Sequence, residues 1–297
     1  MARRDPITAP PATPPRYSLL TAVGANGQTP GAEPWERGVT WQSEACGGGD
    51  VLAATVAVQP ARDAGSRPPR VIASPFYVWA VDDASTTPIS QRDWQGRARR
   101  RLEATQSFQI AREVWTGALT IDTETDPAER NPYLADTTRV VDSAYEAERA
   151  LGVAEALAMS ESQGRRIMLH VPIAVLEAAL RPGGSYIARD TGGVLTTPMG
   201  NIVVVDAGYP GTAPDAYEGG TTTQWIYTSP MLGVRLSAVE TLPGSLADAA
   251  GVAAALSRPA NDLTVWAQRL ALYQLDPCAR IAVSTNVPAL PTPTTLS

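Results

Sequence analysis

Residues 91–117 read QRDWQGRARRRLEATQSFQIAREVWTG, the longest stretch of the 297-residue chain with the pattern of one uninterrupted helix. The stretch holds no proline, Ser90 or Asp93 can cap its first amides, and Gly117 is the residue type that often follows a helix end. Apolar side chains recur at steps of three and four and predict one packing face. The members of this face are Trp94, Ala98, Ala104, Phe108, Ala111 and Trp115. A rise of about 1.5 Å per residue predicts a rod of roughly 40 Å, which is long for a compact domain and favours a subunit that packs against neighbours.

One turn of this helix carries four arginines, and like charges this close destabilise an isolated helix. We therefore expect them to meet acidic groups or phosphates. Three interpretations are open: a solvated face that pairs with carboxylates such as Glu103, salt bridges between subunits, and contact with a nucleic acid. The four are Arg97, Arg99, Arg100 and Arg101, and they are candidate intersubunit contacts.

Upstream of the helix, the pattern predicts an extended arm and then a β-hairpin. Residues 1–16 are rich in Pro, Ala and Thr, and such a segment gains order only by lying against something. Residues 51–58 and 71–81 are β-rich runs on either side of a polar tip, ARDAGSRPP, so they predict a long hairpin that rests on another chain. Arg62, Arg67 and Arg70 on this hairpin are further candidate intersubunit contacts.

Two segments are candidate hinges. Gly47, Gly48 and Gly49 form a glycine run, but no lysine or hydroxyl follows as a phosphate-binding loop requires, so we interpret the run as flexible backbone. The second candidate is the turn at residues 82–88, between the hairpin and the helix.

Downstream of the helix, helical and strand patterns mix without strict alternation, which predicts an α+β fold. A second helix is predicted at 142–162, with Tyr145, Val153, Ala156 and Leu157 on its packing face. A buried strand follows at 165–171, and Pro172 opens a short helix. The remaining predicted elements are strands at 201–206, 222–228, 232–241, 263–275 and 279–287, and an Ala-rich helix at 246–256.

Composition narrows the function classes. The hydrophobic share of 44% supports a real core, and the charged share of 18% lies below the usual quarter or so. A net charge of −6 argues against a general nucleic-acid binder, and the 24 basic residues are all arginine. No segment approaches the roughly 18 consecutive apolar residues that span a bilayer, and residues 1–16 lack the apolar run of a signal peptide. Cys46 and Cys278 have no zinc-site or disulfide-framework spacing, so we expect reduced thiols in a cytoplasmic setting.

A search for catalytic chemistry yields no candidate catalytic residue, cofactor site or metal ligand. His170 is the only histidine and lies in the apolar run IMLHVP, so we expect it to be packed and hydrogen-bonded rather than a general base. No G-x-S-x-G, H-E-x-x-H or phosphate-loop pattern occurs. Asp82 and Asp83 are neighbours whose side chains should point apart, towards solvent. Asp206 ends an apolar strand after the tight turn Met199-Gly200-Asn201, and a ligand-binding role for it is the less favoured interpretation.

An ordered set of motifs resembles a known family. PRYSLLTAV, EACGGG, RRLEATQSFQIAREVWTG, NPYLAD, TPMGNIVV and a closing cysteine occur in this order, and Arg269 occupies the central arginine of the terminal segment NDLTVWAQRLALYQLDPCARIAVS. The set is similar to the major capsid proteins of tailed bacteriophages with the Hong Kong 97 type fold, in particular those of phages that infect actinobacteria. The resemblance implies five parts. They are an N-terminal arm (1–50), an extended hairpin loop (51–90), a spine helix with the peripheral domain (91–175), an axial domain (176–260), and return strands with a C-terminal tail (261–297).

The resemblance also implies a function. Copies would form pentamers and hexamers of an icosahedral shell that encloses double-stranded DNA without sequence-specific binding, in a virion assembled in the host cytoplasm. Scaffolding, decoration and portal proteins are the implied partners, and no membrane is involved. The family prototype joins its subunits through a lysine–asparagine isopeptide bond, which a chain without lysine cannot form. Two alternatives are an encapsulin-type shell protein of the same fold and an unrelated α+β enzyme.

Overall fold

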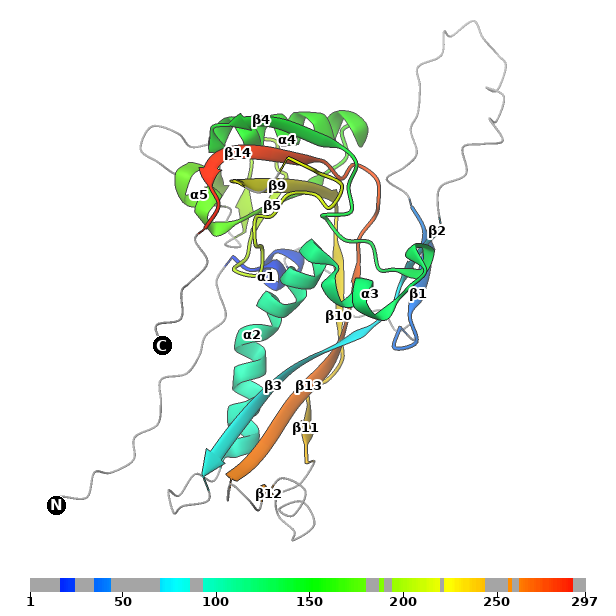
Figure 1. The fold of residues 1–297 in the computed structure, drawn as a ribbon, viewed down its shortest axis with the longest axis vertical. Coiled ribbons are helices and arrows are strands. Elements are labelled where there is room, and N and C mark those ends of the chain that lie inside the picture. The colour runs from blue at the N-terminus through cyan, green and yellow to red at the C-terminus, as the bar shows by residue number, and fades with distance from the viewer. Residues whose placement is uncertain are drawn as a thin grey trace, which may run out of the picture.

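The computed structural model describes residues 17–24, 35–43, 70–85, 93–179, 187–189, 194–219, 222–243, 256–257 and 262–290. Within them, two large sheets are connected by a long helix, α2 (Trp94–Thr116), which lies along one sheet and reaches the other with its C-terminal end (Figure 1). Mixed helices and sheets of this kind confirm the predicted α+β class.

Helix α2 begins and ends where local chemistry stops a helix. The Asp93 carboxylate accepts a hydrogen bond from the Gly96 amide at 3.1 Å, and Gly117 has the left-handed φ of 58° that favours glycine. The short helix α3 (Ala118–Thr123) follows, and the buried carboxylate of Glu113 accepts from the amides of Leu119 and Thr120 at 2.9 and 3.1 Å. Burial raises the pKa of Glu113, and these two amides oppose the shift.

The predicted packing face of α2 is correct in part. Ala98, Ala111 and Trp115 are buried, but Phe108 is 41% exposed. The buried line runs instead through Leu102, Ile110 and Val114. The spacing of apolar residues predicts one buried stripe along the helix. It does not show that α2 packs against two sheets, each of which covers a different side of the helix.

A five-stranded sheet, counted over the described residues, is built around β13 (Asp262–Gln274). On one side β13 pairs with β3 (Phe76–Ser85), antiparallel and in continuous register from Asp262 opposite Ser85 to Ala271 opposite Phe76. On the other side it pairs in turn with β10 (Gly233–Leu236), β11 (Glu240–Leu242) and β12 (Leu256–Ser257). The strand predicted at 232–241 is therefore two strands, because residues 237–239 separate β10 from β11.

Helix α2 contacts both the face and the outer edge of this sheet. Val78, Val265 and Ala267 are buried in the core that contains α2 residues. At the edge of β3, the Gln109 amide side chain accepts from the Trp79 N–H at 3.2 Å and donates to its carbonyl at 3.0 Å. Arg101 donates to the Val81 carbonyl at 2.9 Å.

The predicted hairpin is only partly described. Residues 51–69 lie outside the described part, and so do Gly47, Gly48 and Gly49. The run at 71–81 divides at Pro75: β2 (Arg70–Ala73) pairs with β1 (Val39–Gln42), while β3 pairs with β13. The backbone between them is held by Asn131, which bonds the Ser74 amide and carbonyl at 2.6 and 2.9 Å. The prediction that 71–81 forms one hairpin strand is thus wrong, since sequence alone cannot show a partner as distant as β13.

The second sheet has seven strands in the described chain, in the order β4, β14, β9, β5, β8, β7, β6. Figure 1 labels the first four of them. Their bounds are β4 Val140–Tyr145, β5 Ile167–Val171, β6 Ala188–Arg189, β7 Leu195–Thr196, β8 Ile202–Val205, β9 Thr223–Pro230 and β14 Ala282–Pro288. Helices α4 (Ala147–Glu161) and α5 (Ile173–Ala179) pack with alternate residues such as Leu169. The opposite face, which includes Met168, packs with α1 (Leu19–Gly24) and the C-terminal half of α2.

Helix α4 starts later than predicted, because residues 142–145 belong to strand β4. Its buried face is made of Ala150, Leu151, Ala154 and Ala158. Leu157, placed on the packing face by the sequence, is 39% exposed. The Ala-rich helix predicted at 246–256 falls almost wholly outside the described residues; Leu256 is in β12.

The five predicted parts keep their status as a prediction. The sheets bring together strands that are far apart in the sequence: β14, near the end of the chain, lies between β4 and β9.

Candidate functional site at the junction of the two sheets

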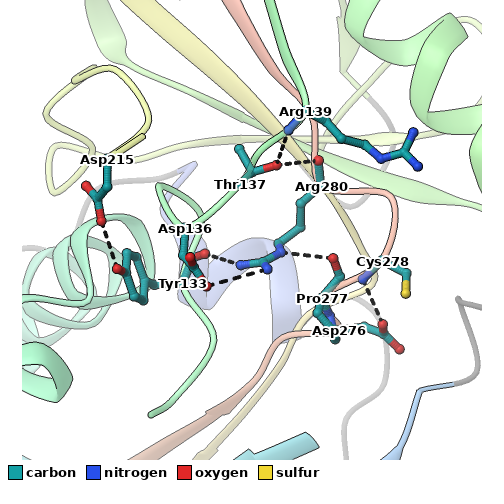
Figure 2. Close-up of polar contacts among 9 residues, drawn as sticks. All are labelled: Tyr133, Asp136, Thr137, Arg139, Asp215, Asp276, Pro277, Cys278 and Arg280. Carbon is teal, nitrogen blue, oxygen red and sulfur yellow. Dashed lines mark hydrogen bonds and ion pairs between the residues drawn. The ribbon is translucent and has the colours of Figure 1, made fainter. Parts of the chain in front are cut away.

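The segment between β13 and β14 passes from one sheet to the other, and Arg280 holds it. This side chain is 9% exposed. Its Nε donates to the Pro277 carbonyl at 3.0 Å, its Nη1 donates to the Tyr133 carbonyl, and its Nη2 lies 3.8 Å from a carboxylate oxygen of Asp136 (Figure 2). Burial lowers the pKa of Arg280 from an ordinary value so high that the group stays charged. The guanidinium thus ties the β13–β14 turn to residues 133–136.

The turn at residues 133–136 that Arg280 contacts is held by further hydrogen bonds. The Tyr133 hydroxyl donates to Asp215 at 2.7 Å, and burial followed by this carboxylate raises the pKa of Tyr133 (Figure 2). Thr137 donates to the Arg280 carbonyl at 2.8 Å and accepts from the Arg139 amide at 3.2 Å. Each polar group points at another group of the chain, which suits a clamp rather than a reaction centre.

The β13–β14 turn also contacts the β1–β2 ribbon, the two-stranded sheet formed by β1 and β2. Asp276 accepts from the Cys278 amide at 3.1 Å and from the Ser43 hydroxyl, just after β1, at 2.5 Å. Cys278 is disulfide-bonded. The prediction of reduced thiols is therefore wrong for Cys278. The only other cysteine, Cys46, lies outside the described residues, and its distance in sequence from Cys278 hid any pairing signal.

The arginine turn of α2 is partly neutralised inside the chain. Arg97 and Arg101 lie 3.1 and 3.0 Å from the same oxygen of Asp82, whose side chain is fully buried. Arg100 pairs with Asp93 at 3.0 Å on the surface. For the exposed Arg99, the described part of the chain provides no ion-pair partner.

The structure bears on three sequence predictions about these charged residues. The Asp82–Asp83 pair does point apart, but only Asp83 reaches solvent. Residues 82–85 belong to strand β3 rather than to the predicted turn at 82–88, whose remaining residues lie outside the described part, so the hinge stays a prediction. In the described chain Asp82 pairs with Arg97 and Arg101 and Asp93 pairs with Arg100, so the carboxylates that neutralise these arginines are not Glu103. The role of these arginines between subunits stays a prediction.

Two of the remaining candidate contacts have no described position. Arg62 and Arg67 lie outside the described residues. Arg70 is exposed in β2, and its Nη2 donates to the Thr40 hydroxyl at 3.5 Å.

His170 is a packed residue, as predicted. Its ring nitrogens lie 2.8 Å from the Tyr209 hydroxyl and 2.8 Å from the Ser229 hydroxyl, and the side chain is fully buried. Ser229 donates its own proton to the Pro230 carbonyl at 2.7 Å, so it accepts from Nε2–H, and Nδ1 accepts from Tyr209. Burial lowers the pKa of His170 to about 3, which removes it as a general base near neutral pH.

Asp206 is likewise occupied by donors from its own chain. Its carboxylate accepts from the Leu19 amide at 3.0 Å, the Ser107 hydroxyl at 2.7 Å and the Gly208 amide at 2.9 Å. These bonds join α1 and α2 to the end of β8. These three contacts give Asp206 a structural role, which the sequence favours over ligand binding.

Arg269, which the motif resemblance singled out, links elements of the five-stranded sheet. It donates to Gln106 of α2 at 3.2 Å and to the Ser237 carbonyl between β10 and β11. Sequence reasoning missed Arg280 and Asp82. The available signal was a charged residue within or beside an apolar run, a setting in which a buried charge needs a partner.

The described residues contain no group of three or more His, Cys, Asp or Glu side chains placed to bind a metal ion. Across the same residues, we find no helix with the length and apolarity to span a bilayer. The hydrogen bonds at the junction can fix the positions of the two large sheets and of the β1–β2 ribbon relative to one another.

Comparison with known proteins gives a match in structure but not in sequence. No protein-family model and no curated protein matches the chain. The capsid of an empty GTA particle is 12% identical, with 96% of this chain and 95% of that chain covered and a TM-score of 0.52. A chain of Mycobacterium phage Bobi is 11% identical, with 96% and 95% covered and a TM-score of 0.50. An encapsulin complex from Synechococcus elongatus is 13% identical over 78% of this chain and 80% of that chain, and its TM-score of 0.40 is too low to support an argument.

At these identities the similarity concerns the fold. The chain has the Hong Kong 97 type fold that its ordered motifs resemble, and the shared fold extends over almost its full length.

Proposed function

We propose that this chain is the major capsid protein of a tailed bacteriophage, similar to those of phages that infect actinobacteria. Copies assemble into pentamers and hexamers, which close into an icosahedral head around double-stranded DNA. The observation that carries the proposal is the fold shared with the GTA capsid over 96% of this chain. The role is structural, with no catalytic step.

Physical features of the chain are consistent with a tile in a shell. Tyr77, Trp79 and Trp266 are each more than 40% exposed on one sheet, although they are large hydrophobic residues. Such side chains are stabilised when another surface covers them. A chain that engages several neighbours also gains avidity, so individual contacts can be weak.

The charge suits a container for DNA. With a net charge of −6 the chain as a whole has no excess of positive charge to grip phosphates, so packaged DNA would be held without sequence-specific binding. Within this proposal the shell assembles in the host cytoplasm, with portal, scaffolding or decoration proteins as partners. Gly47, Gly48 and Gly49 act as a hinge between pentamer and hexamer positions, and Arg99, the member of the 97–101 arginine turn without an ion pair in the described residues, contacts a neighbouring subunit.

Electron microscopy of the purified full chain tests the proposal. We expect capsomers or closed shells when the chain is expressed alone or with neighbouring gene products. A monodisperse monomer in size-exclusion chromatography under all of these conditions would contradict it and revive the enzyme alternative.

The content of the particles separates a virus head from an encapsulin-type compartment. Particles from infected cells should hold double-stranded DNA that resists added nuclease, and mass spectrometry should find this chain as their most abundant protein. Particles filled with a cargo enzyme and free of DNA would favour the encapsulin alternative.

A further inference from the structure

The five-stranded sheet has one face covered by α2 and an opposite face that carries exposed aromatic residues. Along β3, Tyr77 and Trp79 alternate with the buried Val78 and are 56% and 49% exposed. Trp266 of β13 is 42% exposed, and its ring lies against that of Trp79 with centroids 5.1 Å apart. Leu242 of β11 sits directly opposite Trp266 in the strand register and is 46% exposed. We call these four residues the aromatic face.

The charges next to the aromatic face are acidic; Arg235 of β10 is also on this side, but it stands opposite Leu272, at the other end of β13 from Trp266. Asp83 follows Tyr77 and Trp79 on the same side of β3, and Glu240 precedes Leu242 on the same side of β11; both are exposed. The intervening positions of β13 on this side are Thr264, Gln268 and Leu270, none of them basic. A ligand for this face therefore needs apolar groups that stack on aromatic rings and a positive charge.

The chain itself contains a segment with that chemistry. Residues 1–16, MARRDPITAPPATPPR, hold five prolines, three arginines and a single acidic residue. Proline-rich segments favour the polyproline II helix, which has little ordering entropy left to lose and docks on exposed aromatic rings. Arginines at both ends of the segment can pair with Asp83 and Glu240.

We propose that the aromatic face binds the proline-rich residues 1–16 of a neighbouring copy, with prolines stacked on Trp79 and Trp266 and arginines beside Asp83 and Glu240. This inference rests on the proposed shell function, which brings copies side by side.

The position of α1 favours a neighbouring copy over the same chain. Helix α1 starts at Leu19 and packs in the core beneath α2, on the covered side of the sheet. The aromatic face lies on the other side, so residues 1–16 of the same chain would have to round the sheet edge to reach it. A polyproline II helix extends about 3.1 Å per residue, so the segment spans up to roughly 50 Å, enough to reach an adjacent copy.

Peptide binding tests the face directly. A fluorescent synthetic peptide of residues 1–16 is titrated by anisotropy against a chain that lacks those residues. We expect saturable binding that weakens at least tenfold in Trp79→Ala and in Trp266→Thr, and also when the four prolines at positions 10, 11, 14 and 15 of the peptide become alanine. Phe108→Ala is the matched control, since Phe108 is an equally exposed aromatic residue on α2, and it should bind the peptide as the parent chain does. Circular dichroism verifies that each variant is folded.

Photo-cross-linking identifies the copy. p-Benzoyl-phenylalanine is placed at Ala9 in the full chain, and assembled particles are irradiated. A product of twice the chain mass, with the cross-link mapped to β3 or β13, supports the proposal. Cross-links only within one chain overturn it, and so does peptide binding that ignores Trp79 and Trp266.

The binding of residues 1–16 and the capsid function can be refuted separately. If shells form but the peptide does not need the aromatic face, this inference falls and the capsid function stands. If electron microscopy finds no shells or capsomers under any condition, the capsid function falls, whatever the peptide does.

Discussion

At the scale of single residues, His170 shows how a buried polar group is fixed. Its imidazole donates to Ser229 and accepts from Tyr209, and Ser229 has already donated to the Pro230 carbonyl. An imidazolium would carry a second proton on Nδ1, where the Tyr209 hydroxyl now donates. The neutral ring is therefore part of the folded structure.

This arrangement predicts a loss of stability in acid. The pKa of His170 falls from 6.5 to about 3 on folding, so between these values only the unfolded chain binds the proton. The free energy of unfolding should fall as pH drops through this window, by about 1.4 kcal/mol per pH unit from this group. Urea unfolding of the subunit at pH 7 and pH 4 measures it. His170→Gln, which removes the only histidine, should be less stable at pH 7 but should lose about 3 kcal/mol less between the two pH values. Equal losses in both proteins would contradict the assignment.

Arg280 supports a second prediction at this scale. Arg280→Ala leaves the Tyr133 and Pro277 carbonyls without their charged donor and should lower the free energy of unfolding by about 3 kcal/mol. Arg280→Lys should recover only part of this loss, because an ammonium lacks the planar fork. Tyr133→Phe is the control, since it removes the hydroxyl bond to Asp215 but keeps the carbonyl that Arg280 contacts. Chemical denaturation compares the three variants. An Arg280→Ala variant with the same free energy of unfolding as the parent would contradict the stabilising role of Arg280.

The residues of the site differ in how far the sequence predicts them. The packed state of His170 follows from its apolar run, because a lone polar residue there must find partners inside. The pairing of Asp82 with two arginines does not follow, since it needs the angle at which β3 crosses α2. The disulfide of Cys278 is equally hidden, because two cysteines far apart in sequence carry no pairing signal.

At the scale of elements, the boundary between α2 and α3 depends on Gly117. Its φ is 58°, and a Cβ there would lie 2.3 Å from the Tyr133 ring. Gly117→Ala should therefore cost about 2–4 kcal/mol through backbone strain and overlap. Gly152, within α4, is the matched control: a Cβ there meets nothing within 4 Å, so Gly152→Ala should stabilise the chain by about 0.5–1 kcal/mol. Thermal unfolding of both variants tests the opposite signs.

The contact between β3 and α2 provides a further prediction. Replacing Arg97 and Arg101 together by alanine leaves the buried Asp82 carboxylate unpaired and should cost about 3–5 kcal/mol. Asp82→Ala should cost less, because both arginines are partly exposed and can turn to water. Denaturant unfolding of these two variants and of the variant that combines all three substitutions measures the losses and the coupling between Asp82 and the arginines. A larger loss in Asp82→Ala than in the double arginine variant would contradict this order.

Helices were easier to predict than their surroundings. The caps of α2 are local, so Asp93 and Gly117 mark its ends in the sequence as in the structure. Its buried face is not local, because two sheets cover it, and Phe108 consequently faces outward. The start of α4 was misplaced because residues 142–145 belong to β4, which pairs with β14, a strand from the other end of the chain.

At the scale of the whole molecule, the order of motifs predicted more than any one of them. Each motif is weak alone, but together they indicate the Hong Kong 97 type fold, and the structural match extends over 96% of the chain. The mixing of early and late strands in one sheet was beyond sequence patterns. Pairings between distant strands leave no periodic trace.

Assembly should respond to one exposed charge. Arg99 lies on the arginine turn without an ion-pair partner in the described residues, so Arg99→Glu should leave the unfolding free energy within about 0.5 kcal/mol of the parent. If Arg99 contacts a neighbouring subunit, this reversal should reduce the yield of shells severalfold in light scattering and micrographs. Arg112→Glu, at another exposed position of α2, is the control. Equal yields from both variants and the parent would remove Arg99 from the proposed interface.

The side chains of Gln109 and Arg101 occupy the outward backbone groups of β3 at Trp79 and Val81. An open strand edge is a template on which further strands can add without limit, and the hazard grows with protein concentration. If the chain forms a virus head as proposed, many copies are made at once and the risk of fibres is particularly high. With these groups occupied by two helix side chains, a further strand cannot pair with β3 at Trp79 and Val81 unless α2 moves away, which obstructs uncontrolled growth of the sheet at this edge.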